Sequence, residues 1–412
     1  MVVINTISLS YNIILMYFCN ALFNLVMTKT FSIKSSRVCL FALLLAVFSC
    51  TAINKSLQPV HENVSIVFEP DGQYTSMRIP ALVATGKGSL LAFCEGRLGT
   101  SSDWADINLI MRRSTDEGRT WSQVYILDSM KGAPVGNPTP IVDDRGRIHL
   151  LYQKDYARAY YTYSDDDGIS WSKPADITET FNRFRPEYNW NVLAPGPGHS
   201  IQLKNGRLLA PVWLANSPVT SPRRKHAPSC VATIYSDDYG KTWQRGAIVA
   251  DNTPHISNPN ESMAVQLQDG TVLLSIRNPS AVLRRAFSTS PAGIDNWSSV
   301  RFEEELFDPT CMAGIITLPL EKGKDALLFV NPDSRDIEKH PRANLSAKVS
   351  FDNGHTWPVN KVLDAGPAGY SDLALGKNGM IYVLYETNTV GTGFDYTLVL
   401  KKFNTKWLLG AN

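Results

Sequence analysis

The sequence lacks a strong excess of charge of either sign. Its 412 residues carry 40 Lys and Arg against 38 Asp and Glu, which gives a formal net charge of +2 at pH 7. A nucleic-acid-binding surface needs a basic patch or stripe, and the densest basic run here is only Arg223-Arg224-Lys225. We therefore predict no nucleic-acid partner and interpret this run as part of a solvated loop.

The sequence also lacks cysteines arranged for metal binding. Its six cysteines form no Cys-x-x-Cys pair, and no histidine stands at the spacing of a zinc site. Three of them lie in the body of the chain, namely Cys94, Cys230 and Cys311. Each stands alone in an apolar context, so we interpret them as buried free thiols, with one disulfide as the alternative. No metal site is predicted.

Long helical periodicity is absent from residue 64 onward. In its place the sequence has short segments rich in β-branched and aromatic residues, bounded by Gly, Asn, Asp or Pro. This pattern predicts an all-β protein. We expect strands at residues 89–93, 108–112, 148–152, 159–163, 207–212, 231–235, 271–276, 326–330, 347–351 and 380–385.

An octapeptide of the form Ser-x-Asp-x-Gly-x-Thr/Ser-Trp occurs repeatedly. Its four copies are Ser114–Trp121, Ser164–Trp171, Ser236–Trp243 and Ser350–Trp357. Asp and Ser side chains bond turn backbone, Gly supplies a positive φ, and Trp packs beneath the loop, so each copy predicts a tight hairpin turn. A fifth, eroded copy is expected around Ser288–Trp297.

The spacing of the octapeptides predicts a repeat architecture. Their first residues, 114, 164, 236 and 350, indicate a unit of about 55–60 residues, the size of a four-stranded propeller blade with long loops. The body of the chain then holds about six such units. We predict a six-bladed β-propeller over residues 64–412, preceded by a short linker over residues 51–63.

Residues 1–50 have the layout of a secretory leader. A positively charged region from Lys29 to Arg37 precedes a short apolar run over residues 38–48. This run is shorter than a membrane span requires.

The end of this leader is the sequence Val-Phe-Ser-Cys, which resembles a bacterial lipoprotein cleavage box. Cys50 would then become the lipidated first residue of the mature protein. We expect residues 1–26 to precede the true start at Met27. The alternative is a genuine membrane anchor at the N-terminus.

Octapeptides of this form, known as Asp-boxes, stand together with the motif Arg78-Ile79-Pro80 ahead of the first copy. In this combination the chain resembles the sialidase (exo-α-neuraminidase) family of six-bladed propellers, from about Phe68 to the C-terminus. The resemblance implies hydrolysis of terminal α-ketosidically linked sialic acids with retention, through a tyrosyl glycosyl-enzyme intermediate. Asp-boxes also occur in propellers that are not enzymes, so the predicted activity depends on further residues.

Arg78, Arg277 and Arg342 match the three arginines that bind the substrate carboxylate in sialidases. Arg277 follows the strand expected at residues 271–276, and Arg342 lies in His-Pro-Arg-Ala-Asn ahead of the last octapeptide. Guanidinium groups bind carboxylates bidentately and stay charged, which suits the carboxylate on the anomeric carbon of a sialic acid. Arg335, nearby in the same loop, is the alternative to Arg342.

The resemblance also implies a nucleophile. Tyr370 lies in Gly-Tyr-Ser-Asp-Leu, which matches the nucleophile segment of the family, and Glu261 matches the glutamate paired with that tyrosine. A free tyrosine has a pKa of about 10 and is a poor nucleophile at neutral pH. A carboxylate within hydrogen-bond reach can accept its proton, and a neutral nucleophile avoids repelling an anionic substrate.

Three further residues complete the implied site. Asp103 lies in a polar loop where sialidases carry their general acid/base aspartate, and this role requires a raised pKa. Asp106 is the rival, although it abuts the strand expected at residues 108–112. Arg97 resembles the arginine that binds the polar edge of the sugar, and Glu386 matches the glutamate that orients the first arginine.

Taken together, these features predict an exported bacterial exo-sialidase that needs no metal or organic cofactor. The expected substrates are sialylated glycans, glycoproteins or gangliosides. We expect a monomer in the periplasm or on the cell surface, held to a membrane only through a lipid at Cys50. The alternatives on the same scaffold are a trans-sialidase or intramolecular trans-sialidase, and a non-catalytic sialic-acid-binding propeller.

Overall fold

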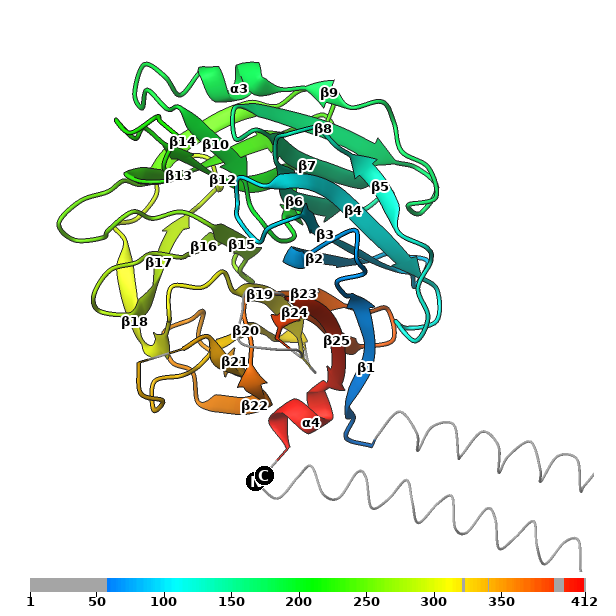
Figure 1. Cartoon of the computed structure of the whole chain (residues 1–412). Coiled ribbons are helices and arrows are strands. Elements are labelled where there is room, and N and C mark those ends of the chain that lie inside the picture. The colour runs from blue at the N-terminus through cyan, green and yellow to red at the C-terminus, as the bar shows by residue number, and fades with distance from the viewer. Residues whose placement is uncertain (1–57, 321–322, 340, 389–395, 411–412) are drawn as a thin grey trace, which may run out of the picture. The chain divides into compact units, whose positions relative to one another are not determined.

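The computed structural model describes residues 58–320, 323–339, 341–388 and 396–410 (Figure 1). The predicted leader over residues 1–50, with Met27 and Cys50, lies outside these described residues. Regular structure in the described part is almost entirely β, with only two short helices, α3 (Thr178–Asn182) and α4 (Thr405–Leu409). The all-β prediction is therefore confirmed. No helix in this part of the chain is long and apolar enough to cross a lipid bilayer.

The strands form six antiparallel sheets, and each sheet is one propeller blade (Figure 1). Blade 1 contains β2 (Ser76–Ala84), β3 (Leu90–Leu98), β4 (Asp106–Ser114) and β5 (Tyr125–Asp128). Blade 2 contains β6 (Val135–Val142), β7 (Ile148–Lys154), β8 (Arg158–Ser164) and β9 (Ala175–Asp176). Blade 3 contains β10 (Val192–Pro195), β11 (Ile201–Gln202), β12 (Leu208–Ala215), β13 (Ser229–Ser236) and β14 (Gln244–Ala250). Blade 4 contains β15 (Ser262–Gln266), β16 (Val272–Ile276), β17 (Arg284–Ser290) and β18 (Arg301–Phe307). Blade 5 contains β19 (Gly314–Pro319), β20 (Asp325–Pro332), β21 (Ala343–Ser350) and β22 (Val359–Pro367). Blade 6 contains β23 (Ser371–Leu375), β24 (Met380–Thr387), β25 (Thr397–Asn404) and β1 (His61–Phe68). The predicted six-bladed propeller is confirmed.

Blade 6 is completed by the first strand of the propeller. Figure 1 shows β1 beside β25, and the two strands pair antiparallel from His61 opposite Phe403 to Phe68 opposite Leu398. This pairing joins the two ends of the propeller and leaves no gap in the ring of blades. The strand begins at His61, earlier than the expected propeller start at residue 64, so it takes in the last residues of the predicted linker 51–63.

The four octapeptides form nearly identical turns between the third and fourth strands of blades 1, 2, 3 and 5. In each turn the first Ser Oγ accepts a hydrogen bond from the Gly N–H at 2.8–2.9 Å and donates one to the Asp carboxylate at 2.8 Å. The same Asp accepts a hydrogen bond from the backbone N–H of the Thr or Ser at 2.8–2.9 Å. The predicted turn chemistry is thus what closes each hairpin.

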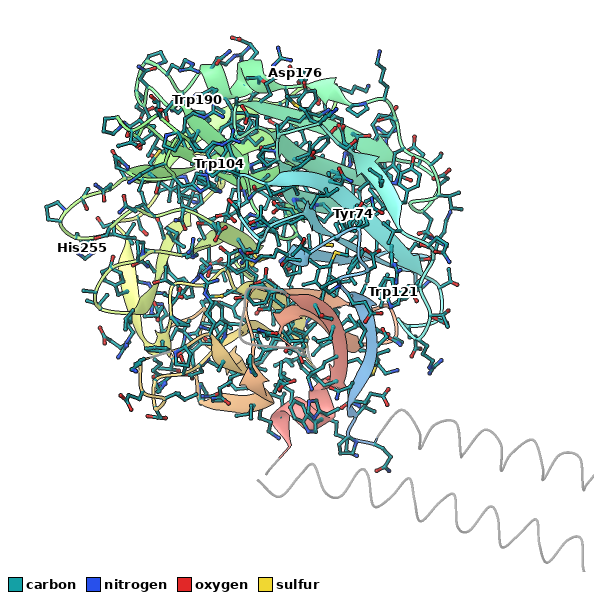
Figure 2. All side chains as sticks on the ribbon, in the orientation of Figure 1. Tyr74, Trp104, Trp121, Asp176, Trp190 and His255 are labelled. Carbon is teal, nitrogen blue, oxygen red and sulfur yellow. The ribbon has the colours of Figure 1, made fainter. Side chains whose placement is uncertain are left out.

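The glycines of these turns also pack against the preceding blade. A Cβ on Gly118 would collide with Leu400 of blade 6, and a Cβ on Gly168 would collide with Leu91 of blade 1. In the first turn, Trp121 Nε1 donates a hydrogen bond at 2.9 Å to Ser65 of β1, at the outer edge of the ring (Figure 2). The octapeptides therefore fix the contact between neighbouring blades as well as the turn itself.

The eroded fifth copy lies in blade 4, but it begins at Ser290 and not at Ser288. Trp297 then stands at the same interval from its serine as in the intact copies. Ser290 Oγ still accepts a hydrogen bond from Gly293 N–H at 2.9 Å. Ala292 stands where the intact copies have Asp, so the carboxylate bonds of the turn are missing.

The buried core lies mainly between adjacent blades. One cluster, for example, joins Leu91 and Phe93 of blade 1 to Ile148 and Leu150 of blade 2. The three cysteines of the propeller are buried free thiols, as predicted, and no disulfide joins them within the described residues.

The antiparallel order of the strands divides the connecting loops between two faces of the ring. Successive strands of a blade alternate in direction. The start of the first strand and the loop between the second and third strands therefore lie on the same face of the ring. The octapeptide turns, between third and fourth strands, lie on the opposite face. We call the first of these the site face.

Candidate active site

Loops and strand starts on the site face enclose a central cavity of about 780 Å³. Sites for small molecules commonly measure about 300–1,000 Å³. The lining residues come from five of the six blades: Arg78, Asp103, Trp213, Lys225, His226, Ala227, Asn258, Asn260, Glu261, Arg277, Pro279, Arg342, Tyr370 and Tyr396. Most of the residues predicted from the sequence are among them.

Three arginines surround the ring of Tyr370. Arg78 lies on β2, Arg277 directly follows β16, and Arg342 directly precedes β21. Their guanidinium carbons lie 5.1, 5.9 and 5.3 Å from the centroid of the Tyr370 ring. Three different blades therefore place three permanent positive charges around one tyrosine.

Arg335, the alternative to Arg342, does not line the cavity. Its guanidinium forms an ion pair with Asp333 at 2.8 Å and donates to the carbonyl of Glu305 at 2.9 Å. Of the two arginines in this loop, only Arg342 faces Tyr370.

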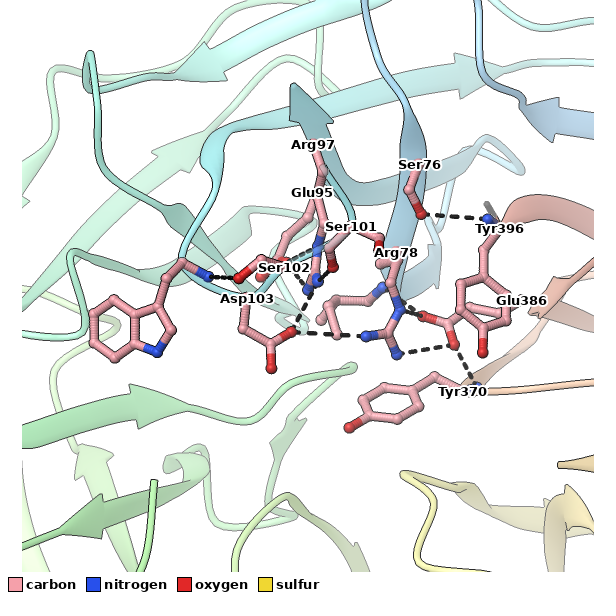
Figure 3. Close-up of polar contacts among 12 residues, drawn as sticks. Ser76, Arg78, Glu95, Arg97, Ser101, Ser102, Asp103, Tyr370, Glu386 and Tyr396 are labelled. Carbon is pink, nitrogen blue, oxygen red and sulfur yellow. Dashed lines mark hydrogen bonds and ion pairs between the residues drawn. The ribbon is translucent and has the colours of Figure 1, made fainter. Parts of the chain in front are cut away.

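Glu386 of β24 holds Arg78 in place. Its Oε1 accepts a hydrogen bond from Arg78 Nε at 3.1 Å, and its Oε2 accepts one from Nη2 at 3.3 Å (Figure 3). The same carboxylate accepts backbone N–H groups of Ile79 and Tyr370, each at 3.0 Å. A side chain at position 369 would collide with it, which explains Gly369. One buried carboxylate thus links Arg78 to the backbone of Tyr370.

The Arg-Ile-Pro segment has an unusual backbone. The pairing of β2 with β3 shifts register between Arg78 and Ala81, as in a β-bulge, and Ile79 has a φ of 59°. This left-handed conformation is unfavourable for a β-branched residue and persists only where the surroundings enforce it. The hydrogen bond from Ile79 N–H to Glu386 is one such constraint. The bulge directs Arg78 into the cavity.

Tyr370 and Glu261 form a direct hydrogen bond. The Tyr370 hydroxyl donates to Glu261 Oε2 at 2.6 Å, and Arg277 Nη1 lies 2.9 Å from the same oxygen. Asn260 accepts a hydrogen bond from Arg277 at 3.0 Å. Burial raises the pKa of Tyr370 above its ordinary value, although Arg277 and the two other arginines oppose this effect. The tyrosine is therefore protonated at neutral pH, with a carboxylate positioned to take its proton.

Asp103 faces the same cavity from the loop between β3 and β4. Its Oδ1 lies 2.8 Å from Arg97 Nη1 and 3.7 Å from Arg78 Nη1 (Figure 3). Burial opposes the effect, but Arg97 and then Arg78 lower the pKa of Asp103 below its ordinary value. The expected raised pKa is therefore not found, because two guanidinium groups outweigh desolvation of a side chain that is 46% exposed.

Asp106, the rival of Asp103, lies at the start of β4 and does not line the cavity. Its carboxylate accepts a hydrogen bond from Gly132 N–H at 3.0 Å. Asp106 therefore caps a turn beside blade 1, and of the two aspartates only Asp103 faces Tyr370.

Arg97 lies behind Asp103 and not on the cavity surface. Its side chain is 0% exposed, and Glu95 Oε2 binds its Nη2 at 2.7 Å and its Nε at 3.2 Å. Burial raises the pKa of Glu95, whereas Arg97 opposes this. A buried carboxylate draws the guanidinium into the protein, and the predicted contact between Arg97 and the sugar stays a prediction.

Sequence reasoning missed Glu95, although a signal was present. Residues two apart on a strand share a face, so Glu95 and Arg97 were bound to meet on β3. The other oxygen of Glu95 accepts the backbone N–H of Asn137 at 3.0 Å, and a Cβ on Gly136 would collide with this carboxylate. Blade 2 therefore holds the carboxylate of Glu95 in place, and this carboxylate holds the guanidinium of Arg97.

An aromatic cluster lies beside the cavity, with His226 and Trp213 in the cavity lining, and it too was missed. The ring of His226 lies 5.4, 4.6 and 5.2 Å from the rings of Trp104, Tyr156 and Trp213. Burial lowers the pKa of His226, which keeps the imidazole largely uncharged at neutral pH. Tyr396 lies against Arg78, whose guanidinium carbon is 5.0 Å from its ring centroid. These residues are scattered along the sequence, and no local motif marks them.

No group of three or more His, Cys, Asp or Glu side chains suited to a metal ion occurs within the described ranges.

The chain is similar to known proteins over most of its length. Residues 88–383 match the family of BNR repeat-like domains. The chain is 29% identical over 384 residues to the sialidase of Micromonospora viridifaciens, covering 86% of this chain and 55% of that protein. It is 27% identical over 361 residues to the sialidase of Bacteroides fragilis, covering 79% of this chain and 62% of that protein.

A solved structure gives a similar result. The Hadza microbial sialidase Hz136 matches with a TM-score of 0.67 at 27% identity, covering 83% of this chain and 68% of that one. The chain thus spans between one half and two thirds of the length of the Micromonospora and Bacteroides proteins.

Proposed function

The chain belongs to the sialidase family of BNR repeat-like propellers, and on this premise we propose that it is an exo-sialidase. It hydrolyses terminal α-linked sialic acids of glycans, glycoproteins or gangliosides. One observation carries the proposal: the hydroxyl of Tyr370 donates a 2.6 Å hydrogen bond to Glu261 inside a ring of three arginines.

The charges of the cavity suit a carboxylate substrate. Arg78 is paired with Glu386, and Arg277 with Glu261. Arg342 donates to the carbonyl of Thr310 at 2.7 Å, and no carboxylate of the described residues forms an ion pair with it. The arginine cluster therefore keeps an unbalanced positive charge, which favours binding of the carboxylate of a sialic acid.

The first chemical step is a displacement at the anomeric carbon. The oxygen of Tyr370 attacks this carbon while its proton passes to Glu261, and protonated Asp103 gives its proton to the departing glycosidic oxygen. The bond to the aglycone breaks as the tyrosyl bond forms. In the second step Asp103 removes a proton from water, the water oxygen attacks the same carbon, and Glu261 returns the proton to Tyr370. Two displacements give net retention.

Asp103 must become protonated for this role, although its pKa is low in the free protein. A substrate carboxylate bound to Arg78 neutralises one of the two guanidiniums that stabilise the ionised form. The bound sugar also excludes water from the half-exposed aspartate side chain. Both effects raise the pKa of Asp103 in the complex.

A fluorogenic sialoside tests the proposal. Wild-type protein should release the fluorophore, and Tyr370→Phe should lower kcat by about a thousandfold or more, because it removes the nucleophile and leaves the cavity intact. Circular dichroism of both proteins controls for folding. Wild-type turnover by the folded Tyr370→Phe protein would refute the mechanism.

Product analysis separates the related activities on this scaffold. NMR of the earliest product should show free sialic acid in the α configuration, as retention requires. Sialic acid that appears on an added sugar, or as an internally cyclised product, would identify a transferase. Binding without any turnover would instead identify a sialic-acid-binding propeller.

We also propose that the protein is exported and lipidated at Cys50. The arrangement of charged and apolar residues before this cysteine supports the proposal. Mass spectrometry of the mature N-terminus should find an acylated Cys50, and Cys50→Ala should abolish the modification and membrane attachment. An unprocessed N-terminus would contradict the proposal.

A further inference from the structure

The basic run Arg223-Arg224-Lys225, interpreted from the sequence as part of a solvated loop, lies at the mouth of the cavity. It belongs to the loop between β12 and β13, and Lys225 lines the central cavity. A second cavity of about 340 Å³ adjoins the first, and we call it the side pocket. The two cavities share Asp103, Lys225 and His226.

The side pocket lies next to the proposed general acid and not next to the proposed nucleophile. It includes Asp103 and Trp104 but none of Tyr370 and the three arginines around it. Because Asp103 gives its proton to the glycosidic oxygen, the departing group starts at this aspartate. The side pocket shares Asp103 with the central cavity and has the indole of Trp104 in its lining, so it is a place for the next sugar.

The charge of the side pocket is positive. Arg224 is paired with Asp155 at 2.9 Å, and its guanidinium carbon lies 5.3 Å from the Trp104 ring centroid. Arg223 lies 5.9 Å from the same centroid. No carboxylate of the described residues lies within ion-pair distance of Arg223 or Lys225.

The other charged groups at the side pocket do not cancel this charge. Asp103, its one acidic lining residue, is already paired with Arg97 at 2.8 Å. Asp155 is matched by Arg224, and burial keeps His226 largely uncharged at neutral pH. Two cations, Arg223 and Lys225, are thus left for a ligand.

We propose that the side pocket is a subsite for an aglycone sugar that carries its own carboxylate or sulfate group. The second residue of an α2,8-linked oligosialic acid is one such sugar, and a sulfated galactose or glucosamine is another. In this arrangement the arginines around Tyr370 bind the terminal sialic acid, and Arg223 and Lys225 attract the anion on the next residue. The inference rests on the proposed function and extends it to the choice of substrate.

Matched substrate pairs test this inference. One pair is the α2,8-linked sialic acid dimer and the same dimer with its reducing-end carboxylate as a methyl ester. The other is α2,3-sialyl-N-acetyllactosamine with and without a sulfate. The variant Arg223→Gln, at a residue that lines the side pocket and not the central cavity, should lower kcat/KM for an anionic member by about two- to fivefold, the range for one exposed charge pair. The neutral members should change by less than about twofold, and added salt should weaken the wild-type preference.

The control variant is Lys241→Gln, which removes an exposed lysine from the octapeptide turn on the opposite face. It loses the same type of charge and should leave both members of each pair unchanged. A response of only one pair identifies the anion as carboxylate or sulfate and supports the subsite. An equal loss for neutral and anionic members would mean that the loop contacts the terminal sialic acid, and this would overturn the inference. So would a wild-type protein without preference for either anion. A wild-type protein inactive on every sialoside would instead refute the proposed function itself.

Discussion

The carboxylate of Glu95 acts on the candidate site without touching the cavity. Its Oε2 lies 2.7 Å from Arg97 Nη2, and Arg97 Nη1 lies 2.8 Å from Asp103 Oδ1. The buried arginine is therefore bound between two carboxylates. Burial raises the pKa of Glu95, Arg97 opposes this effect, and Asp103 adds to it. Because like charges disfavour each other's ionised form, Glu95 in turn favours protonation of Asp103. The protonation of Asp103 thus depends on a residue that a substrate never reaches.

Wild-type kcat/KM should rise as the pH falls below neutrality. The pKa of Asp103 in the free protein lies below its ordinary value, and the general acid must be protonated. Glu95→Gln removes a negative charge that raises the pKa of Asp103, so the decline of kcat/KM with pH should move to lower pH. The measurement is the pH profile of kcat/KM for both proteins on one sialoside.

The glutamine keeps the acceptor for the Asn137 N–H, which separates loss of charge from loss of a structural hydrogen bond. Lower activity with an unchanged profile would show a structural role only.

Two kinds of element shape the propeller: octapeptide turns that lock neighbouring blades, and strands that bury charged side chains. Gly118 exemplifies the first, since its φ of 82° and its contact with Leu400 both exclude a side chain. Lys348 of β21 exemplifies the second, with a side chain that is 1% exposed.

Gly118→Ala should lower the free energy of unfolding by about 2–4 kcal/mol, because it combines a strained φ with a collision against Leu400. Gly88→Ala is the matched control, since Gly88 has a φ of 90° but open space around it. This control should cost about 1 kcal/mol, from strain alone. Denaturant unfolding measures both, and equal losses would show that the contact between blades contributes nothing.

Lys348 should make stability depend on alkaline pH. Its Nζ lies 2.8 Å from Asn331 Oδ1 and 3.2 Å from Asp333, and burial, opposed by Asp333, lowers its pKa from 10.5 to about 8. Above about pH 8 the folded protein has released a proton that the unfolded chain still binds. This group therefore contributes a rise in stability of about 3 kcal/mol as the pH increases from 8 to 10.5.

Lys348→Met should lack this rise. The free energy of unfolding of both proteins is measured across that pH range. Tyrosines and cysteines titrate in both proteins, so their contribution cancels in the difference. Parallel curves for the two proteins would contradict the prediction.

The whole molecule is held closed by two strands from opposite ends of the propeller. β1 adds the fourth strand to blade 6, and it buries Val67 and Phe68 completely or nearly so. Without it, β25 would become an exposed sheet edge, and the ring would be left open at one blade.

A chain that begins at residue 69 should therefore be less stable than one that begins at residue 59. Burial of Val67 and Phe68 alone contributes about 3–6 kcal/mol. For a domain of this size we expect Tm to fall by about 10 °C, and the exposed edge of β25 should promote association. Calorimetry and light scattering measure both effects, and equal Tm values would show that the ring does not need β1.

At this scale the contributions of sequence and tertiary structure separate clearly. The octapeptides predicted the turns and, through their spacing, the number of blades, and the short β-branched and aromatic segments predicted the strands. Turn formation is local, so each copy carries its own hydrogen-bonding groups and its own glycine. The placement of Tyr370, Glu261 and the three arginines in one cavity was also anticipated, through motifs that resemble a family. Their catalytic roles stay predictions that the experiments above test.

Only the tertiary structure decided the electrostatics around these residues. Arg97 was expected to bind the polar edge of the sugar, and its guanidinium lies buried behind Asp103, because Glu95 and the backbone of blade 2 hold it there. The pKa of Asp103 was expected to be raised and is lowered. Burial and charge depend on groups that distant parts of the chain bring together, and no local pattern records them. The sequence by itself therefore determined where the blades and the reactive side chains are, and the packing of blade against blade decided their exposure and their charge.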